Sequence, residues 1–138
     1  MSPRWLPAFF LLASVAHSTE ALFESDSKRF GNPKMDIVVA EVERRPRVSV
    51  LDIRIKAVGS SVGSSFFLLC SVRELARQRG NFRYVSKIEK NADGHMLIGF
   101  LTHAGESAAN LGAEFEAAGT AATEIDLERF APICDRMQ

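Results

Sequence analysis

Residues 65–80, SFFLLCSVRELARQRG, predict the long helix around which the rest of this chain is arranged. One stripe at helical spacing is apolar, and its members are Leu68, Leu69, Val72, Leu75 and Ala76. Ser64 or Ser65 is placed to cap the first turn, because a serine hydroxyl accepts a hydrogen bond from a free backbone N–H. Gly80 is suited to a left-handed C-cap. We therefore expect a helix over 65–79 with one buried face.

Strand patterns lie on both sides of this helix. Residues 47–58, RVSVLDIRIKAV, alternate apolar and polar side chains in their second half, which is the period of a strand with one buried face. They follow a β-branched run at 37–42, so the two runs predict an antiparallel hairpin. After the helix, residues 82–90 and 95–102 flank a tight-turn signal. The chain is therefore expected to be α+β, with a mostly antiparallel sheet of about four strands and helix 65–79 packed on one face.

The segment 66–88, FFLLCSVRELARQRGNFRYVSKI, resembles a unit of small exported bacterial envelope proteins. That unit has an apolar helix, Glu-Leu-Ala, a basic residue, a glycine and an aromatic strand. Many of these proteins are lipoproteins with a β-α-β-β core. The resemblance implies an envelope setting and no particular chemistry. This sequence departs from the lipoproteins because its first cysteine, Cys70, lies far behind the N-terminal apolar segment.

The N-terminal residues have the pattern of a secretory signal. Arg4 precedes an apolar run at 6–16, LPAFFLLASVA, which is as long as a signal core and about half a membrane span. Small residues follow, so we expect cleavage within residues 16–21 and export of the product to the periplasm or the medium. A buried N-terminal strand or helix of a cytosolic protein is the alternative. We expect a signal peptide at 1–21, a flexible tail at 22–34 and a single α+β domain at 35–138.

Composition excludes several classes of function. The 138 residues suit one domain, and 17 Lys+Arg balance 17 Asp+Glu, so no net charge favours nucleic acid as a partner. No apolar run reaches the roughly 18 residues of a membrane-spanning helix, so no such segment is expected after signal cleavage. In an oxidising compartment the two cysteines, Cys70 and Cys134, are expected to form a disulfide. Two unlinked thiols are the alternative.

A G-x-S-x-G match at 59–63 offers one route to catalysis. Ser61 would be the nucleophile, with Asp93 and His103 available for the order of a hydrolase triad. An elbow serine turns directly into its helix, however, whereas Gly63 and two further serines intervene here. A sheet of hydrolase size also needs more than about 120 residues. A flexible connector ending in a capping serine is the simpler interpretation, and a small serine hydrolase using Ser61 remains the alternative.

Few other residues suggest a site. His95 and His103 are eight residues apart, about 26 Å along a strand, so no shared metal ion is expected. The segment 58–80 has no lysine for a phosphate-binding loop, and no cofactor is expected. Arg44, Arg45 and Arg47 form a basic turn that could hold an anionic partner or keep a strand edge from pairing.

We therefore expect a small exported domain, more consistent with binding than with catalysis. Its partner would be an unknown envelope protein or surface component. The sequence leaves open its oligomeric state and whether residues 104–124 form a weak helix around 107–118 or a flexible arm.

Overall fold

The expected helix is α1 (Ser61–Gly80), and it begins earlier than the apolar stripe predicts. Ser60 is the N-cap, and its side chain accepts a hydrogen bond of 3.0 Å from the Gly63 amide. The hydroxyls of Ser64 and Ser65 donate to the carbonyl of Ser61, so these serines lie inside the first turns and do not cap them. At the other end Asn81, with φ 59°, is the left-handed C-cap in place of Gly80.

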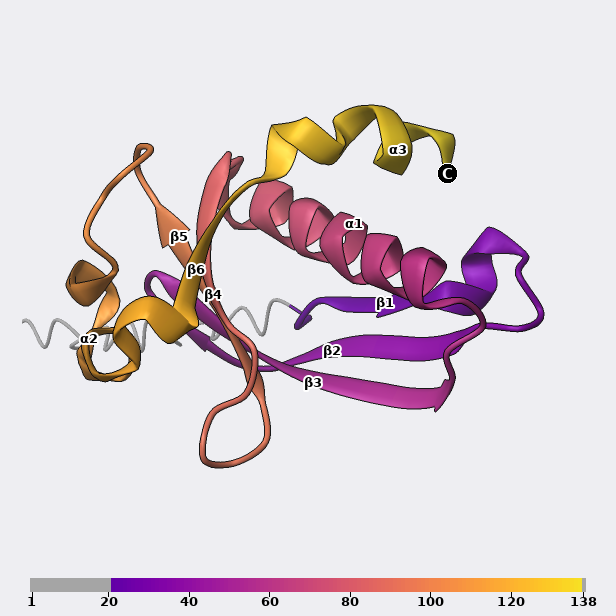
Figure 1. The fold of residues 1–138 in the computed structure, drawn as a ribbon, viewed down its shortest axis with the longest axis horizontal. Coiled ribbons are helices and arrows are strands. Elements are labelled where there is room, and N and C mark those ends of the chain that lie inside the picture. Colours follow the sequence, from indigo (N-terminus) through magenta and orange to yellow (C-terminus); the bar gives the residue numbers. More distant parts are fainter. Residues whose placement is uncertain (1–20, 138) are drawn as a thin grey trace, which may run out of the picture.

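The computed structural model describes residues 21–137, and its main layer is an antiparallel sheet of six strands (Figure 1). The strands are β1 (Glu24–Asp26), β2 (Asp36–Arg45), β3 (Val48–Ala57), β4 (Tyr84–Ile88), β5 (Met96–Leu101) and β6 (Ala122–Asp126). Their order is β1-β2-β3-β5-β4-β6, and all five neighbouring pairs are antiparallel. The α+β class, the antiparallel sheet and both expected hairpins are confirmed, but the number of strands is six and not four.

The two additional strands are short edge strands that the sequence pattern hides. The polar composition of residues 22–34 predicts a flexible tail, whereas the structure has β1 and a 3-10 turn (Ser27–Phe30) in this segment. Phe23 is buried beside β2, and its carbonyl accepts a hydrogen bond from the Glu41 amide. At the opposite edge β6 pairs with β4. Strands of three and five residues are too short to show a clear period of two.

Residues 104–124, for which the sequence left two alternatives open, contain several short elements. A 3-10 turn (Ala108–Leu111) is followed by α2 (Ala113–Ala118), a second 3-10 turn (Gly119–Ala121) and the start of β6. Gly112, with φ 127°, interrupts the helical path as the sequence suggested. Phe115 on α2 is buried in a small second core against Val48, Val50, Ile88 and Leu97. The segment therefore contains a helix, shorter than the 107–118 of the first alternative, and this helix is docked on the sheet.

The main core lies between α1 and the other face of the sheet, where Phe67 and Leu75 from the helix are fully buried. The C-terminal helix α3 (Ala131–Arg136) lies against α1 (Figure 1). Cys134 of α3 is joined to Cys70 of α1, so the expected disulfide is present. Within residues 21–137, no helix combines the length and apolar character needed to cross a membrane. The expected signal peptide lies, apart from Ala21, outside the described residues.

Candidate functional site

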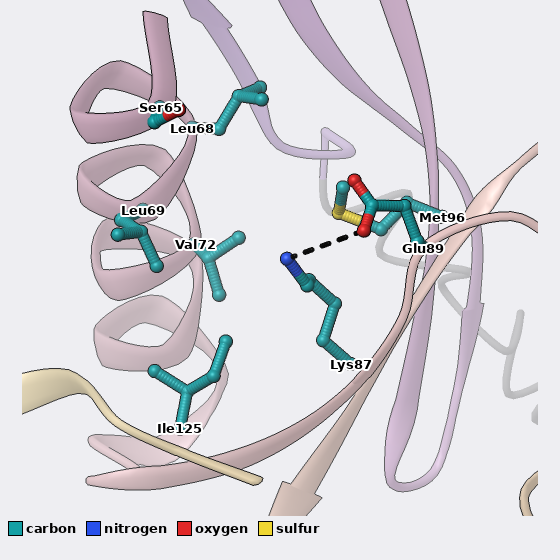
Figure 2. Close-up of a pocket in the computed structure, with 8 residues that line it drawn as sticks. All are labelled: Ser65, Leu68, Leu69, Val72, Lys87, Glu89, Met96 and Ile125. Carbon is teal, nitrogen blue, oxygen red and sulfur yellow. Dashed lines mark ion pairs between the residues drawn. The ribbon is translucent and has the colours of Figure 1, made fainter. Parts of the chain in front are cut away.

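A cleft opens between α1 and the β4–β6 side of the sheet (Figure 2). Its volume is about 150 Å³. One wall comes from four α1 side chains at helical spacing, Ser65, Leu68, Leu69 and Val72, and the other from Lys87, Glu89, Met96 and Ile125. The walls are apolar apart from Ser65 on the helix and the charged pair on the strand side. Such a cleft can accept an apolar group that has a charged group next to it.

The sheet topology explains why this cleft is open. β3 and β5 pair over four residues only, Val48–Leu51 with Met96–Gly99, and the loop between β4 and β5 then lies on the side of the sheet away from α1 (Figure 1). The first half of α1 consequently packs over the β1–β3 part of the sheet. Leu68 and Leu69 are only partly buried where the two parts separate, and together with the buried Val72 they form the helix wall of the cleft (Figure 2).

The charged residues of the cleft are held loosely. Lys87 Nζ lies 4.0 Å from Glu89 Oε2, and the side chains are 26% and 82% exposed. A pair this long and this exposed contributes little to stability. The Lys87 ammonium lies beside the apolar wall, where it can exchange Glu89 for the anionic group of a ligand (Figure 2).

Lys87 is the cleft residue that sequence reasoning passed over. Val85 on β4 is buried in the main core, and the period of two puts Lys87 on the same side of the sheet. A charged side chain at a core-facing position of a strand was the available signal. The leucines of the cleft were assigned from the sequence to the buried stripe of the helix, whereas they are only partly buried.

The structure does not bring the three residues of the hydrolase alternative, Ser61, Asp93 and His103, together in one site. Ser61 is the first residue of α1, and within residues 21–137 the only non-glycine residue with a positive φ is Asn81, so Ser61 does not occupy a strained elbow. Asp93 precedes β5 and His103 follows it. A six-residue strand spans about 20 Å, which places these two side chains at opposite ends of β5.

Each arginine of the basic turn has its own intramolecular carboxylate. Arg44 binds Glu41, with Nη2 2.6 Å from Oε1. Arg45 pairs with Glu43 and Glu114, at 3.0 and 2.8 Å. Arg47 donates to the Phe100 carbonyl and lies 2.6 Å from Glu106 Oε1. Arg44 is paired within β2, whereas Arg45 and Arg47 join the turn to α2 and to β5 with the segment after it. The three arginines point to different carboxylates, and their arrangement does not form a common anion site.

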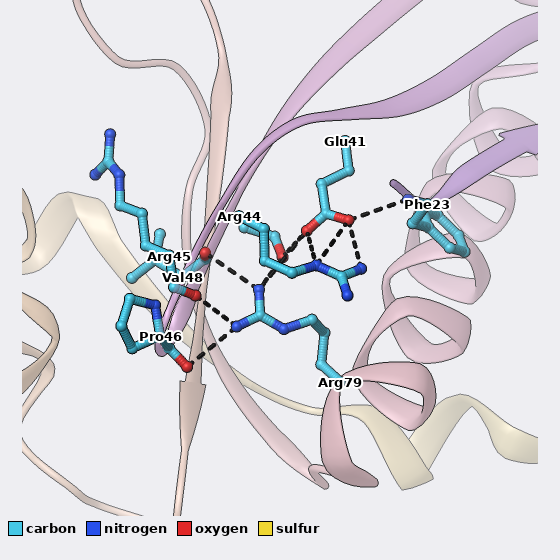
Figure 3. Close-up of polar contacts among 8 residues, drawn as sticks. Phe23, Glu41, Arg44, Arg45, Pro46, Val48 and Arg79 are labelled. Atoms are coloured by element: carbon cyan, nitrogen blue, oxygen red, sulfur yellow. Dashed lines mark hydrogen bonds and ion pairs between the residues drawn. The ribbon is translucent and has the colours of Figure 1, made fainter. Parts of the chain in front are cut away.

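Glu41 is the centre of a buried polar network beneath the β2–β3 turn (Figure 3). Its carboxylate is fully buried and accepts hydrogen bonds from Arg44, the Ser49 hydroxyl and the Phe23 amide. Burial opposes ionisation of this group, but these hydrogen bonds outweigh it and lower the pKa of Glu41.

Arg79 at the end of α1 completes the network. It donates to Ser49 Oγ and to the carbonyls of Arg45, Pro46 and Val48 (Figure 3). Glu41 carries one negative charge against the two guanidinium groups of Arg44 and Arg79, and the contacts above engage all three side chains, so the network fixes the helix end over the turn.

Metal ligands are not gathered in the described part of the chain. Among residues 21–137, no group of three His, Cys, Asp or Glu side chains is placed to hold an ion. Comparisons with protein-family models, with curated proteins and with solved structures find no match for this chain.

Proposed function

We propose that this chain is an exported, non-enzymatic domain that binds an apolar part of another envelope component in the cleft beside α1. The observation that carries the binding role is the partly buried leucine wall with Lys87 facing it. Partly buried leucines that face a cation across a small cleft support a site for a small apolar group with an adjacent negative charge.

Three features support a periplasmic or secreted location. Residues 1–21 have the pattern of a cleaved signal, and residues 66–88 resemble small exported envelope proteins. The Cys70–Cys134 disulfide suits an oxidising compartment. Fractionation of cells that make the full chain tests this part of the proposal. We expect an extracytoplasmic product that begins between residues 17 and 22, whereas a cytosolic product that retains Met1 would contradict it.

The binding role is tested with anilinonaphthalene sulfonate, a probe that joins an apolar ring system to an anion. We expect its fluorescence to rise with the wild-type domain, and amide shifts in an NMR titration to map to the cleft. Leu69→Glu and Lys87→Glu should both weaken binding, since one makes the wall polar and the other repels the sulfonate. Leu22→Glu is the matched control, because Leu22 is 44% exposed and lies outside the cleft. Equal binding by all three variants would contradict the proposal.

A further inference from the structure

We propose that the outer half of β3 is a strand-addition site for an extended acidic peptide, whose apolar side chains enter the cleft. This inference rests on the proposed function and names the partner's chemistry. β3 pairs with β2 from Val48 to Ala57 but with β5 only as far as Leu51. Residues 52–57 therefore have one open edge, and Figure 1 shows no strand beside it. Unpaired backbone N–H and C=O groups on such an edge can hydrogen-bond an incoming strand.

The open edge leads into the cleft. The last β3–β5 pair is Leu51 with Met96, and Met96 lines the cleft. A strand added beside Ile53 and Ile55 would continue the line of β5 past its first residue. Ile53 packs partly against the main core, and Ile55 is 53% exposed although it lies on the same face. Alternate apolar side chains of an added strand would cover Ile55 and extend toward the leucine wall.

The other face of the edge selects for negative charge. Arg54 and Lys56 alternate with the isoleucines, and both are exposed. Arg54 is bound to Asp52 at 2.9 Å, with side chains that are 60% and 34% exposed, while Lys56 makes no ion pair within the described residues. This face of β3 therefore carries two positive charges, Arg54 and Lys56, and one negative charge, Asp52. Side chains directly opposite each other on paired strands interact, so acidic residues at alternate positions of the added strand would be stabilising.

A second copy of β3 is the competing occupant of the same edge. The antiparallel register that places Arg54 opposite Arg54 also forms two Asp52–Lys56 pairs, so the pairwise contacts alone do not exclude it. Residues 52–57 carry two positive charges and one negative charge, however, so two copies of this segment repel each other overall, whereas an acidic strand supplies the opposite charge. The same cations would prevent pairing with arbitrary strands, which gives the edge selectivity as well as affinity.

The test uses a short fluorescent peptide of alternating Glu and Val, with a Lys and Val peptide of equal length as the control. We expect the acidic peptide to bind the wild-type domain and the basic peptide not to bind. The charge-reversed variant Arg54→Glu with Lys56→Glu should weaken acidic-peptide binding by about tenfold or more, because two cross-strand charge pairs become repulsive. Both side chains are exposed, and an unchanged circular dichroism spectrum verifies that the variant is folded.

Backbone pairing is tested separately. Successive backbone N–H groups of a strand point to opposite edges, so N-methylation of every second residue blocks hydrogen bonds on one edge only. Methylation of the edge that faces β3 should abolish binding, and methylation of the opposite edge should leave binding unchanged. Equal binding of both methylated peptides would overturn strand addition.

Other results overturn this inference and leave the proposed function standing. One is that anilinonaphthalene sulfonate binds in the cleft but the acidic peptide does not bind at all. Another is that the domain dimerises without peptide in sedimentation and Arg54→Glu with Lys56→Glu abolishes the dimer, which would assign the edge to a second copy. If neither the sulfonate nor the peptide binds, the proposed function fails as well.

Discussion

The guanidinium of Arg79 on α1 lies 3.6 Å from the carboxylate of Glu41 on β2, and both side chains are buried, with 8% and 0% exposed. The helix end and the β2–β3 turn are thus connected through one ionised acid. The Arg79 guanidinium also lies 4.9 Å from the centre of the Phe100 ring on β5, which adds a cation–π contact. Arg79 and its partner Glu41 therefore connect α1, β2 and β5.

Glu41→Ala should lower the free energy of unfolding by about 3 kcal/mol or more. The substitution removes the carboxylate that compensates the buried Arg79 guanidinium and leaves the Phe23 amide without its side-chain acceptor, and removing one partner of a buried ion pair has a cost of about 3–5 kcal/mol. Urea denaturation followed by circular dichroism measures the change. Glu43→Ala is the control, because the Glu43 side chain is 55% exposed and its ion pair should contribute little to stability. Equal effects of the two substitutions would show that the buried network is not a stabilising unit.

Removal of the disulfide by Cys70→Ala with Cys134→Ala should destabilise the domain by up to about 4 kcal/mol. The bridge closes a loop with a sequence separation of 64, and the estimate follows from the entropy that the unfolded chain regains. Chemical reduction of the wild type should lower the urea midpoint to a similar extent.

The effect of this removal should be greatest at α3. Apart from the bridge, Arg73 holds α3 through Asp135 at 3.3 Å, and the Asp135 side chain is 64% exposed, so this ion pair is weak. Hydrogen exchange should increase at residues 131–136 while the β2–β3 hairpin stays protected. Uniform exchange increases throughout the domain would instead show that α3 does not open separately.

The sequence predicted those elements whose pattern is long enough to repeat. β3 shows its alternation from Leu51 to Ala57, and α1 shows more than two turns of apolar stripe. β1 has only three residues and follows the buried Phe23. The residues around Phe23 are mostly polar, so the sequence gives no sign that this side chain is buried. Local pattern cannot reveal an edge strand that is stabilised by a partner elsewhere in the chain.

The candidate site was hidden for a different reason. The helical spacing of Leu68 and Leu69 predicts core residues, whereas in the structure they are partly buried and line the cleft beside α1. The basic turn was visible in the sequence, and Glu43 next to it pairs with Arg45, but two further carboxylates, Glu114 for Arg45 and Glu106 for Arg47, come from more than fifty residues away. The sequence shows that these positions are positively charged. Only the tertiary structure shows that the arginines are already paired with carboxylates and are therefore not available to a ligand.

Ser60 and Ser61 should respond differently to substitution by alanine. Ser60→Ala removes the N-cap hydrogen bond to the Gly63 amide and should destabilise the domain by about 1 kcal/mol. Ser61→Ala, at the first helical position, should change stability by less than about 0.5 kcal/mol. A serine-reactive fluorophosphonate should label neither the wild type nor the variants, as judged by intact mass. Labelling that disappears in Ser61→Ala alone would restore the hydrolase interpretation.

The stability of the domain should fall with acidification because of Glu106. Hydrogen bonds from Arg47 and from the Thr102 amide lower the pKa of Glu106 from 4.5 to about 2, although partial burial opposes this. A group with a lowered folded-state pKa stabilises the protein above its unfolded pKa, and this contribution is lost as the pH falls from about 4.5 to about 2. Glu41 acts in the same direction, since its pKa is also lowered.

Glu106→Gln isolates this contribution. Glutamine retains one acceptor oxygen but loses the charge, so we expect a loss of about 1 kcal/mol near pH 7 and almost none near pH 2. Thermal unfolding of both proteins across this range measures the difference, and Glu116→Gln, at an exposed position on α2, serves as the control. The two melting curves should converge as the pH approaches 2. A constant difference at every pH would mean that Glu106 acts through packing, because only an ionised carboxylate makes the Arg47 contact pH-dependent.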